Sequence, residues 1–272
     1  MLTFAAFLPH PPIMVPQIGG ANSAKCQETG KAFDTICQIA EKSEIETLVI
    51  ISPHTSIHPN EMTVSFNNFA CGDFSAFDKA DIKIRKEIDV DLAENIYKIS
   101  KKMSIPTRLL EQDNCYNIDH ASMVPLLFLE DHVPPSLKIV IIGFSLLERQ
   151  SHLDFGKAIY KAIKKIGYNV GIIFSGDMSH KIFEEGSEFV GQKFDKEILS
   201  AIKENRLAKI LETNEYLQEE AGECGYRSLL IALGLSQEYG LDKIRSKVLS
   251  YEAPFGVGYM VANFELKQTE TP

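Results

Sequence analysis

Residues 47–54 read TLVIISPH, and the rest of the predicted sheet is built around this stretch. Leu48, Val49, Ile50 and Ile51 follow one another with no polar residue between them, a pattern typical of a strand covered on both faces. Pro53 has no N–H to donate and therefore ends the strand. His54 is thus expected just beyond the carboxyl end of a buried central strand.

Two further stretches end in the same way. Residues 2–10 read LTFAAFLPH, and residues 171–180 read GIIFSGDMSH. In an open α/β sheet, ligands bind in the crevice beyond the carboxyl ends of the strands. We therefore expect His10, His54 and His180 to meet at one sheet edge and to form a metal site or an acid–base site there.

Strands alternate with amphipathic helices along the chain, which predicts an α/β three-layer sandwich with a central mixed, mostly parallel sheet flanked by helices. No internal repeat, low-complexity segment or linker is seen, so residues 1–272 are expected to form a single domain. A hairpin-like flap with a turn at Gly72 and Asp73 is expected after a strand at 61–66. Helices are expected at 21–44, 90–103, 151–166, 189–202 and 207–217, at the apolar stretch 123–129 with Asp119 as its N-cap, and from 222–227 through Leu233. The expected closing antiparallel strands are 247–252 and 258–265.

Composition excludes several classes of protein. The 272 residues are 44% hydrophobic, so the chain can bury a full core without a disulfide or a structural metal. A net charge of -9 argues against sequence-independent nucleic-acid binding, which requires Lys and Arg to neutralise phosphates. The same acidic balance disfavours anionic membrane surfaces. We expect neither nucleic acid nor membrane as a partner.

Cysteine usage and the N-terminus indicate a cytoplasmic protein. The five cysteines include no C-x-x-C pair, and an odd count fits reduced thiols better than a disulfide scaffold. The N-terminus is apolar but lacks a basic segment and a cleavage site, so it is expected to be a strand and not a signal peptide. No apolar run approaches the ~20 residues of a membrane span.

His10 and His54 are the first candidates for metal ligands, because each follows a buried strand and adjoins a proline. Two histidines and one carboxylate leave positions open on an octahedral iron. Glu223, between Gly222 and Cys224, is the best candidate carboxylate, and Cys224 is a competing ligand that would favour Zn(II), Cu(I) or thiolate-ligated iron. The alternatives are loop-capping histidines, a Glu223 that stabilises a helix N-terminus and a Cys224 that packs in the core.

His180 and His120 are candidates for proton transfer, since each has a carboxylate close in sequence. Asp177 lies three residues before His180, and Asp119 directly precedes His120. A positioned base with a pKa near 7 contributes roughly a hundredfold to ten-thousandfold to a rate. Alternatively, Asp177 and Asp119 cap a turn or a helix. The other three histidines, His58, His132 and His152, are expected at the surface.

Six ordered motifs resemble one family. LPHPPI at Leu8, ISPH at Ile51, DHASMVPL at Asp119, SGDMSH at Ser175, AGECGYRSL at Ala221 and YEAPFGVGY at Tyr251 are similar to the class III extradiol dioxygenase (LigB-type) superfamily. Within it, they are most similar to the Memo-like, AmmeMemoRadiSam branch. The resemblance covers nearly the whole chain.

The resemblance implies specific roles. In ring-cleaving members, Fe(II) is held by two histidines and a glutamate, which correspond to His10, His54 and Glu223, while His180 corresponds to the catalytic base and His120 to a second pocket histidine. Cys224 corresponds to a cysteine of the Memo-like branch, so Glu223 and Cys224 stay alternatives for the third ligand, with Zn(II) or Cu as alternative metals.

The resemblance and the candidate ligands lead to one expected function and two alternatives. The expected function is extradiol cleavage of an aromatic diol by O2, with Asp177 assisting His180. The alternatives are a Memo-like redox or adaptor protein that binds a peptide or protein partner, and a metal-assisted hydrolase that uses the same cleft. A radical-SAM-linked protein is the partner that the name of the branch suggests, and a homo-oligomeric state is left open.

Overall fold

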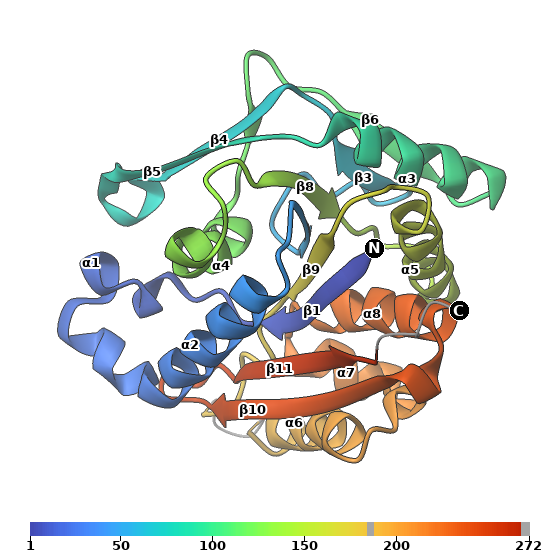
Figure 1. Cartoon of the computed structure of the whole chain (residues 1–272). Coiled ribbons are helices and arrows are strands. Elements are labelled where there is room, and N and C mark those ends of the chain that lie inside the picture. Colours follow the sequence, from blue (N-terminus) through green and yellow to red (C-terminus); the bar gives the residue numbers. More distant parts are fainter. Residues whose placement is uncertain (184–187, 268–272) are drawn as a thin grey trace.

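The structure is a computed structural model that describes residues 1–183 and 188–267 (Figure 1). Its main sheet has eight strands, and neighbours in this sheet come from distant parts of the sequence. From one edge to the other the strands are β10 (Ile244–Glu252), β11 (Tyr259–Leu266), β1 (Leu2–Leu8), β9 (Val170–Ser175), β2 (Thr47–Ser52), β8 (Lys138–Gly143), β3 (Met62–Ser65) and β6 (Thr107–Leu110).

The centre of this sheet is parallel and buried. β2 pairs in parallel with β8 and β9, and β9 pairs in parallel with β1, whereas β11 and β3 join antiparallel on either side. Every residue of β2 is buried, as expected for an uninterrupted apolar strand between two helical layers. The prediction of a mixed, mostly parallel sheet is confirmed, as is the antiparallel β10–β11 pair.

Helices cover both faces of the sheet, which confirms the predicted three-layer sandwich. Because side chains alternate along a strand, Val49 and Ile51 pack on one helical layer while Leu48 and Ile50 pack on the other. The first layer contains α3 (Val90–Lys102), α5 (Arg149–Ile163), α6 (Glu188–Lys203), α7 (Glu215–Ala221) and α8 (Tyr226–Tyr239), and the second contains α2 (Gln27–Lys42) and α4 (His120–Leu129).

The predicted flap exists, but its turn lies elsewhere. β4 (Phe69–Phe74) and β5 (Lys79–Glu87) form an antiparallel ribbon that β7 (Tyr116–Asn117) extends, and Figure 1 shows the ribbon lying above α4. The chain reverses through a 3-10 turn at η3 (Ser75–Phe77), not at Gly72. Gly72 lies within β4, where a Cβ atom would stand 2.8 Å from the carbonyl oxygen of Ile118. Close packing therefore explains this glycine.

Several predicted helices differ in detail. The first turns of the helix expected at 21–44 form a 3-10 helix, η2 (Gly20–Cys26), and the helix expected at 207–217 is split into η5 (Leu207–Glu212) and α7. His152 was expected at the surface but is fully buried in α5. The remaining short elements are η1 (Pro12–Met14), α1 (Pro16–Gly19), η4 (Glu130–His132) and η6 (Leu241–Lys243).

One disulfide joins Cys71 to Cys115, so the expectation that all five cysteines are reduced thiols is wrong for this pair. The two residues are 44 positions apart and meet because β4 pairs with β7.

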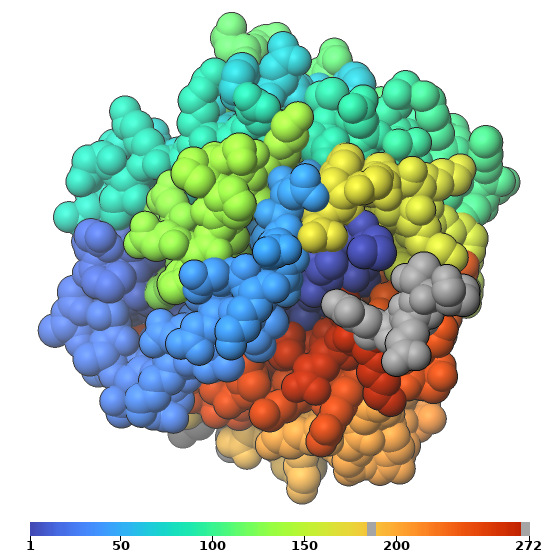
Figure 2. Space-filling model, in the orientation of Figure 1, coloured from blue at the N-terminus to red at the C-terminus, as the bar shows by residue number. Residues whose placement is uncertain are grey.

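Figure 2 shows the N-terminal segments (blue) packed against the C-terminal strands (red). None of the helices in residues 1–183 and 188–267 combines the length and apolar character of a transmembrane span.

Candidate metal centre

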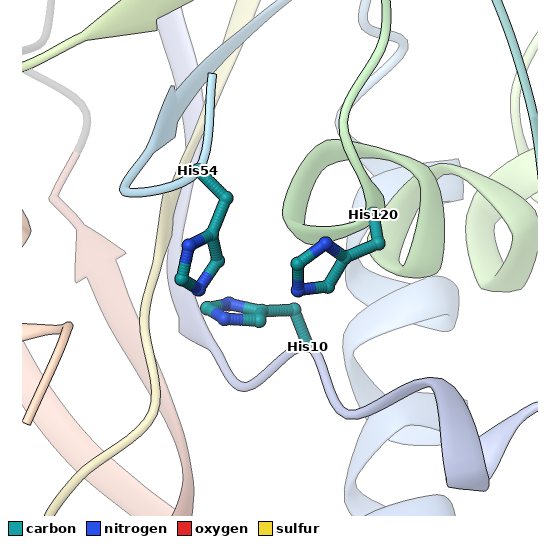
Figure 3. A group of neighbouring side chains, drawn as sticks. All are labelled: His10, His54 and His120. Carbon is teal, nitrogen blue, oxygen red and sulfur yellow. The ribbon is translucent and has the colours of Figure 1, made fainter. Parts of the chain in front are cut away.

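Three histidines from different parts of the chain converge at the carboxyl ends of the central strands (Figure 3). His10 follows β1, His54 follows β2, and His120 begins α4. The ring centroids are 5.0 Å apart for His10 and His54 and 4.6 Å apart for His54 and His120, and the last two rings are stacked. One nitrogen from each ring lies within 4.8 Å of the other two. The predicted meeting of His10 and His54 is therefore seen, with His120 as a third member.

The hydrogen bonds of His10 leave one of its ring nitrogens free for a ligand. Nδ1 of His10 lies 2.9 Å from Oγ of Ser175, and the Ser175 hydroxyl lies 2.8 Å from the carbonyl oxygen of Ala121. A carbonyl can only accept, so the Ser175 proton points to Ala121 and Nδ1 of His10 must donate to Ser175. Nε2 then carries the lone pair. Fixing the tautomer through the other nitrogen is how proteins orient metal-binding histidines.

A carboxylate and a thiol lie on the other side of this nitrogen. Sγ of Cys224 is 3.6 Å from Nε2 of His10, and Oδ2 of Asp177 is 3.9 Å from it. The backbone holds both groups in place: His10 N–H donates to Oδ1 of Asp177 over 3.0 Å, and Asp177 N–H donates to Sγ of Cys224 over 3.2 Å. His10, Asp177 and Cys224 therefore form a second candidate ligand group that shares His10 with the first.

Glu223 is directed away from these groups. Its carboxylate accepts a hydrogen bond from Nε2 of Gln218 over 2.7 Å and one from the backbone N–H of Tyr226 at the start of α8. Burial raises the pKa of Glu223, and the Tyr226 N–H opposes that shift. Glu223 thus makes the contacts of a helix-stabilising residue. Of the two sequence candidates for the third ligand, the structure brings Cys224 to His10 and not Glu223.

The electrostatics of the site keep its imidazoles neutral. Burial lowers the pKa of His10 well below its usual value, and a charge on His54 or His120 would lower it further. Loss of hydration also lowers the pKa of His54 and of His120. Neutral imidazole is the form that binds metals. Burial raises the pKa of Asp177 to about 6 and that of the Cys224 thiol well above its ordinary value.

Asp119 ties β2 to α4 and so sets the spacing of His54 and His120. Its carboxylate accepts the Ser122 N–H as the N-cap of α4, which confirms that prediction, and it also accepts the Ser52 hydroxyl over 2.6 Å. Oγ of Ser52 in turn accepts the backbone N–H of His54 over 3.2 Å. Asp119 therefore positions both histidine-bearing segments through their backbones.

His180 lies on a loop that the surrounding chain holds tightly. Its N–H donates to the carbonyl of Ala221 over 3.1 Å, and the N–H of Ser179 donates to Oδ1 of the buried Asp195 over 2.8 Å. Oδ2 of Asp195 accepts the Tyr251 hydroxyl over 2.5 Å. Loss of hydration lowers the pKa of His180, while the nearby Asp177 opposes that shift. His180 is exposed and feels the charges of Asp177 and His54, but among the described residues it belongs to neither candidate ligand group, so the expected meeting of three histidines involves His120 in its place.

The sequence reasoning missed Ser175 and Asp195 as site-building residues. Ser175 ends β9 within a motif that was noted, but its role depends on the register of β1 against β9, in which Leu8 lies opposite Ser175. Asp195 lies between Phe194 and Ile198 on a helix, and a carboxylate among core positions is the signal that could have found it.

A cavity of about 770 Å³ adjoins His120. It lies between the β4–β5 ribbon and the start of α4, and His120 and Asp119 form part of its wall. Phe77, Ile84 and Ile118 line it with apolar surface, and the ring centroid of Phe77 is 5.6 Å from that of His120. Its size falls in the range of small-molecule sites, roughly 300–1,000 Å³.

Comparison with known proteins identifies the family of the chain. The family model of the catalytic LigB subunit of aromatic ring-opening dioxygenase matches residues 4–262. Protein CA_C1420 of Clostridium acetobutylicum is 31% identical over 97% of this chain, and the chain spans 58% of that relative's length. A MEMO1 family protein of Archaeoglobus fulgidus is 23% identical over 76% of this chain and 69% of its own.

A solved structure shares the fold. The uncharacterized protein JW3007 of Escherichia coli K12 superposes with a TM-score of 0.59 at 14% sequence identity, over 96% of this chain and 99% of the other. At that identity the likeness concerns the fold alone. The family match is different in kind, because it covers nearly the whole chain and contains every histidine and carboxylate of the site. The chain belongs to the LigB family of the class III extradiol dioxygenase superfamily, and its MEMO1 relative supports the Memo-like branch of that superfamily.

Proposed function

We propose that this chain is a metal-dependent oxidoreductase of the extradiol type, whose substrates are O2 and an aromatic diol or a related small molecule. One observation carries the proposal: Nε2 of His10, left with its lone pair by the Ser175 contact, has imidazoles on one side and Asp177 with Cys224 on the other. A buried nitrogen with this surrounding fits a divalent metal.

The donor set fits Fe(II) if Asp177 takes the place that Glu223 was expected to fill. His10, His54 and the Asp177 carboxylate make up the two-histidine, one-carboxylate set of non-haem iron oxygenases. Iron bound there would offer open coordination positions to O2 and to the diol, and the diol itself would supply the electrons that reduce O2. The chain itself supplies neutral imidazoles and a buried carboxylate, and so keeps the ligands in the forms that bind a cation.

The residues around the candidate ligands suit an aromatic substrate. Phe77 and Ile118 offer apolar surface to the cavity, and His120 forms part of its wall. His180 has a lowered pKa and is therefore neutral at pH 7, so its imidazole can accept the proton of a substrate hydroxyl. Asp177, through its charge, stabilises the imidazolium that results.

A second candidate function rests on the position of Cys224. A thiol 3.6 Å from Nε2 of His10 favours a thiolate-ligated Zn(II) or Cu(I), in keeping with the Memo-like relative. Such a centre would serve a redox or adaptor protein with a peptide or protein partner. Zn(II) at the same residues would also lower the pKa of a bound water and so support hydrolysis.

Oxygen uptake by iron-reconstituted protein tests the first function. Protein loaded anaerobically with Fe(II) should consume O2 in step with catechol, protocatechuate or an aminophenol and form a coloured ring-opened product. His180→Gln should retain its iron and lose about a hundredfold in kcat, because the base is removed while the ligands stay. If protein with stoichiometric iron consumes no O2 with any of these compounds, the dioxygenase proposal fails and the Cys224-centred function takes its place.

A further inference from the structure

The Cys71–Cys115 disulfide occupies an unusual place in the wall of the cavity beside His120. Both cysteines are half-buried and both line this cavity. Their Cα atoms are 6.0 Å apart, a separation that ordinary disulfides span. Cys71 lies in β4 and Cys115 directly precedes β7, and these two strands are joined by only two residue pairs, Ala70 with Tyr116 and Cys71 with Asn117. The covalent bond therefore reinforces a very short strand pairing that a change in sulfur chemistry could loosen.

The two sulfur atoms stand in different electrostatic surroundings. Nη1 of Arg85 lies 3.4 Å from Sγ of Cys71, and the Arg85 guanidinium is 4.0 Å from the ring centroid of Phe69, which holds it in place. Sγ of Cys115 instead faces the carbonyl oxygen of Phe69 at 3.4 Å. A neighbouring cation stabilises a thiolate, and a carbonyl oxygen does not. Cys71 is thus the better leaving group of the two.

We propose that Cys71–Cys115 is a reversible thiol–disulfide exchange site whose co-substrate is a dithiol reductant. The reductant's thiolate attacks Sγ of Cys115, the S–S bond breaks, and Cys71 leaves as a thiolate beside Arg85. The second thiol of the reductant then displaces Cys115 from the mixed disulfide. The protein gains two electrons and two protons, and the dithiol becomes a disulfide.

The bond is placed so that its state reaches the candidate metal centre. The N–H of Ile118 donates to the carbonyl of Cys71 over 2.9 Å, and the chain runs from Cys115 through Ile118 directly into His120. Phe77, at the tip of the same ribbon, contacts the His120 ring. Reduction therefore removes the covalent link between the ribbon and the segment that leads to His120, and leaves only backbone pairing between them. An effect of reduction on metal or substrate binding at His120 rests on the proposed function, whereas the thiol–disulfide exchange itself does not.

Thiol alkylation and reduction kinetics test the exchange. Protein purified in air and denatured should alkylate three of its five cysteines, and peptide mapping should show Cys71 joined to Cys115. Dithiothreitol should reduce the bond in the folded protein, with unchanged far-UV circular dichroism, and an excess of oxidised dithiothreitol should restore it by the reverse exchange. Arg85→Gln should slow reduction about threefold to tenfold, because the leaving thiolate loses its cation. Arg85→Lys should restore the rate.

Lys83→Gln is the matched control, because Lys83 lines the same cavity on the same strand. The disulfide of the Lys83→Gln variant should be reduced at the wild-type rate. Five alkylated cysteines without reductant, a bond that is reduced only when the protein unfolds, or equal rates for Arg85→Gln and Lys83→Gln would each overturn the proposal.

A fluorescent reporter tests the coupling to the cavity separately. The chain contains no Trp, so Phe77→Trp introduces a single indole beside His120. Reduction should shift its emission to longer wavelength as the ribbon loosens, and a Cys71→Ser, Cys115→Ser background should show the shifted spectrum with or without dithiothreitol. An emission spectrum that does not respond to reduction of the bond would contradict the coupling while leaving the exchange intact.

Discussion

The thiol of Cys224 lies 3.6 Å from Nε2 of His10, while the neighbouring Glu223 carboxylate bonds Gln218 and the first N–H of α8. Adjacent residues thus take opposite directions at the end of α7, where Gly222 adopts a left-handed conformation with φ of 63°. This arrangement brings Asp177 and Cys224, and not Glu223, next to His10.

Glu223→Ala should lower the free energy of unfolding by about 1–3 kcal/mol without releasing metal. The change leaves the N–H of Tyr226 and the amide of Gln218 without their acceptor, and an unsatisfied buried donor costs about that much. Urea unfolding would measure the stability, and Glu223→Gln, which keeps an acceptor oxygen, is the control with the smaller loss. A complete loss of metal in Glu223→Gln would contradict the account.

Ser175→Ala should weaken metal binding about tenfold to a hundredfold, because Nδ1 of His10 loses the acceptor that fixes its tautomer. Titration with Co(II) in the visible spectrum measures the affinity. Ser228→Ala is the matched control, since Ser228 is another fully buried serine and donates to the backbone carbonyl of Ser175 over 2.8 Å. Equal affinities in the two variants would exclude a role of Ser175 beyond packing.

His152 should make the stability of the protein fall in mild acid. Burial lowers the pKa of this fully buried histidine, although its nitrogens face the carbonyls of Glu148 and Ser145. Because the folded pKa lies below the unfolded value of about 6.5, the unfolded chain binds more protons between the two values. The stability that neutral His152 allows is therefore fully present above pH 6.5. It is lost as the pH falls from 6.5 toward the lower pKa of His152 in the folded protein.

The measurement is urea unfolding of wild type and His152→Gln at pH 7.5, 6.5 and 5.5. Asp177 and Asp195, whose pKa values are raised to about 6, act in the opposite direction, so the two proteins must be compared and not wild type alone. The wild type should lose more stability than His152→Gln over this range, by at most about 1.4 kcal/mol per pH unit. Parallel curves would show that His152 does not titrate with folding.

Tyr251→Phe should destabilise the protein by about 1–2 kcal/mol and lower the contribution of His180 to turnover. Its hydroxyl holds the buried Asp195 carboxylate, which in turn holds the Ser179 N–H next to His180. Tyr239→Phe removes a hydroxyl that bonds an exposed backbone carbonyl and should change stability by less than about 0.5 kcal/mol. Equal effects of the two changes would contradict a positioning role for Tyr251.

Much of the fold could be predicted because apolar runs such as Leu48 to Ile51 have few alternatives. The buried parallel centre, the flanking helices and the Asp119 cap follow from local pattern and capping chemistry. Residues that meet only through sheet register could not be predicted. Cys71 and Cys115 are brought together by the two-residue β4–β7 pairing, which leaves no periodic signal in the sequence.

The site was predicted in part for the same reason. His10 and His54 were placed together because strand ends meet at one edge of a parallel sheet. The direction of the Glu223 side chain depends on the left-handed conformation of Gly222. In such a tight turn, a shift of one residue decides whether Glu223 or Cys224 points toward His10. The burial of His152 could not be predicted, because it depends on the packing of α5 on α8, two helices that are far apart in the sequence.

Metal content of protein purified without oxygen and reconstituted with Fe(II) tests the central claim most directly. Wild type should retain one metal per chain. His54→Ala and Asp177→Asn should lose it, and Glu223→Gln should keep it. Loss in Cys224→Ala together with retention in Asp177→Asn would select the thiolate-ligated centre over the iron oxygenase. Retention of metal by His54→Ala, or no bound metal in wild type, would contradict a metal centre at these histidines.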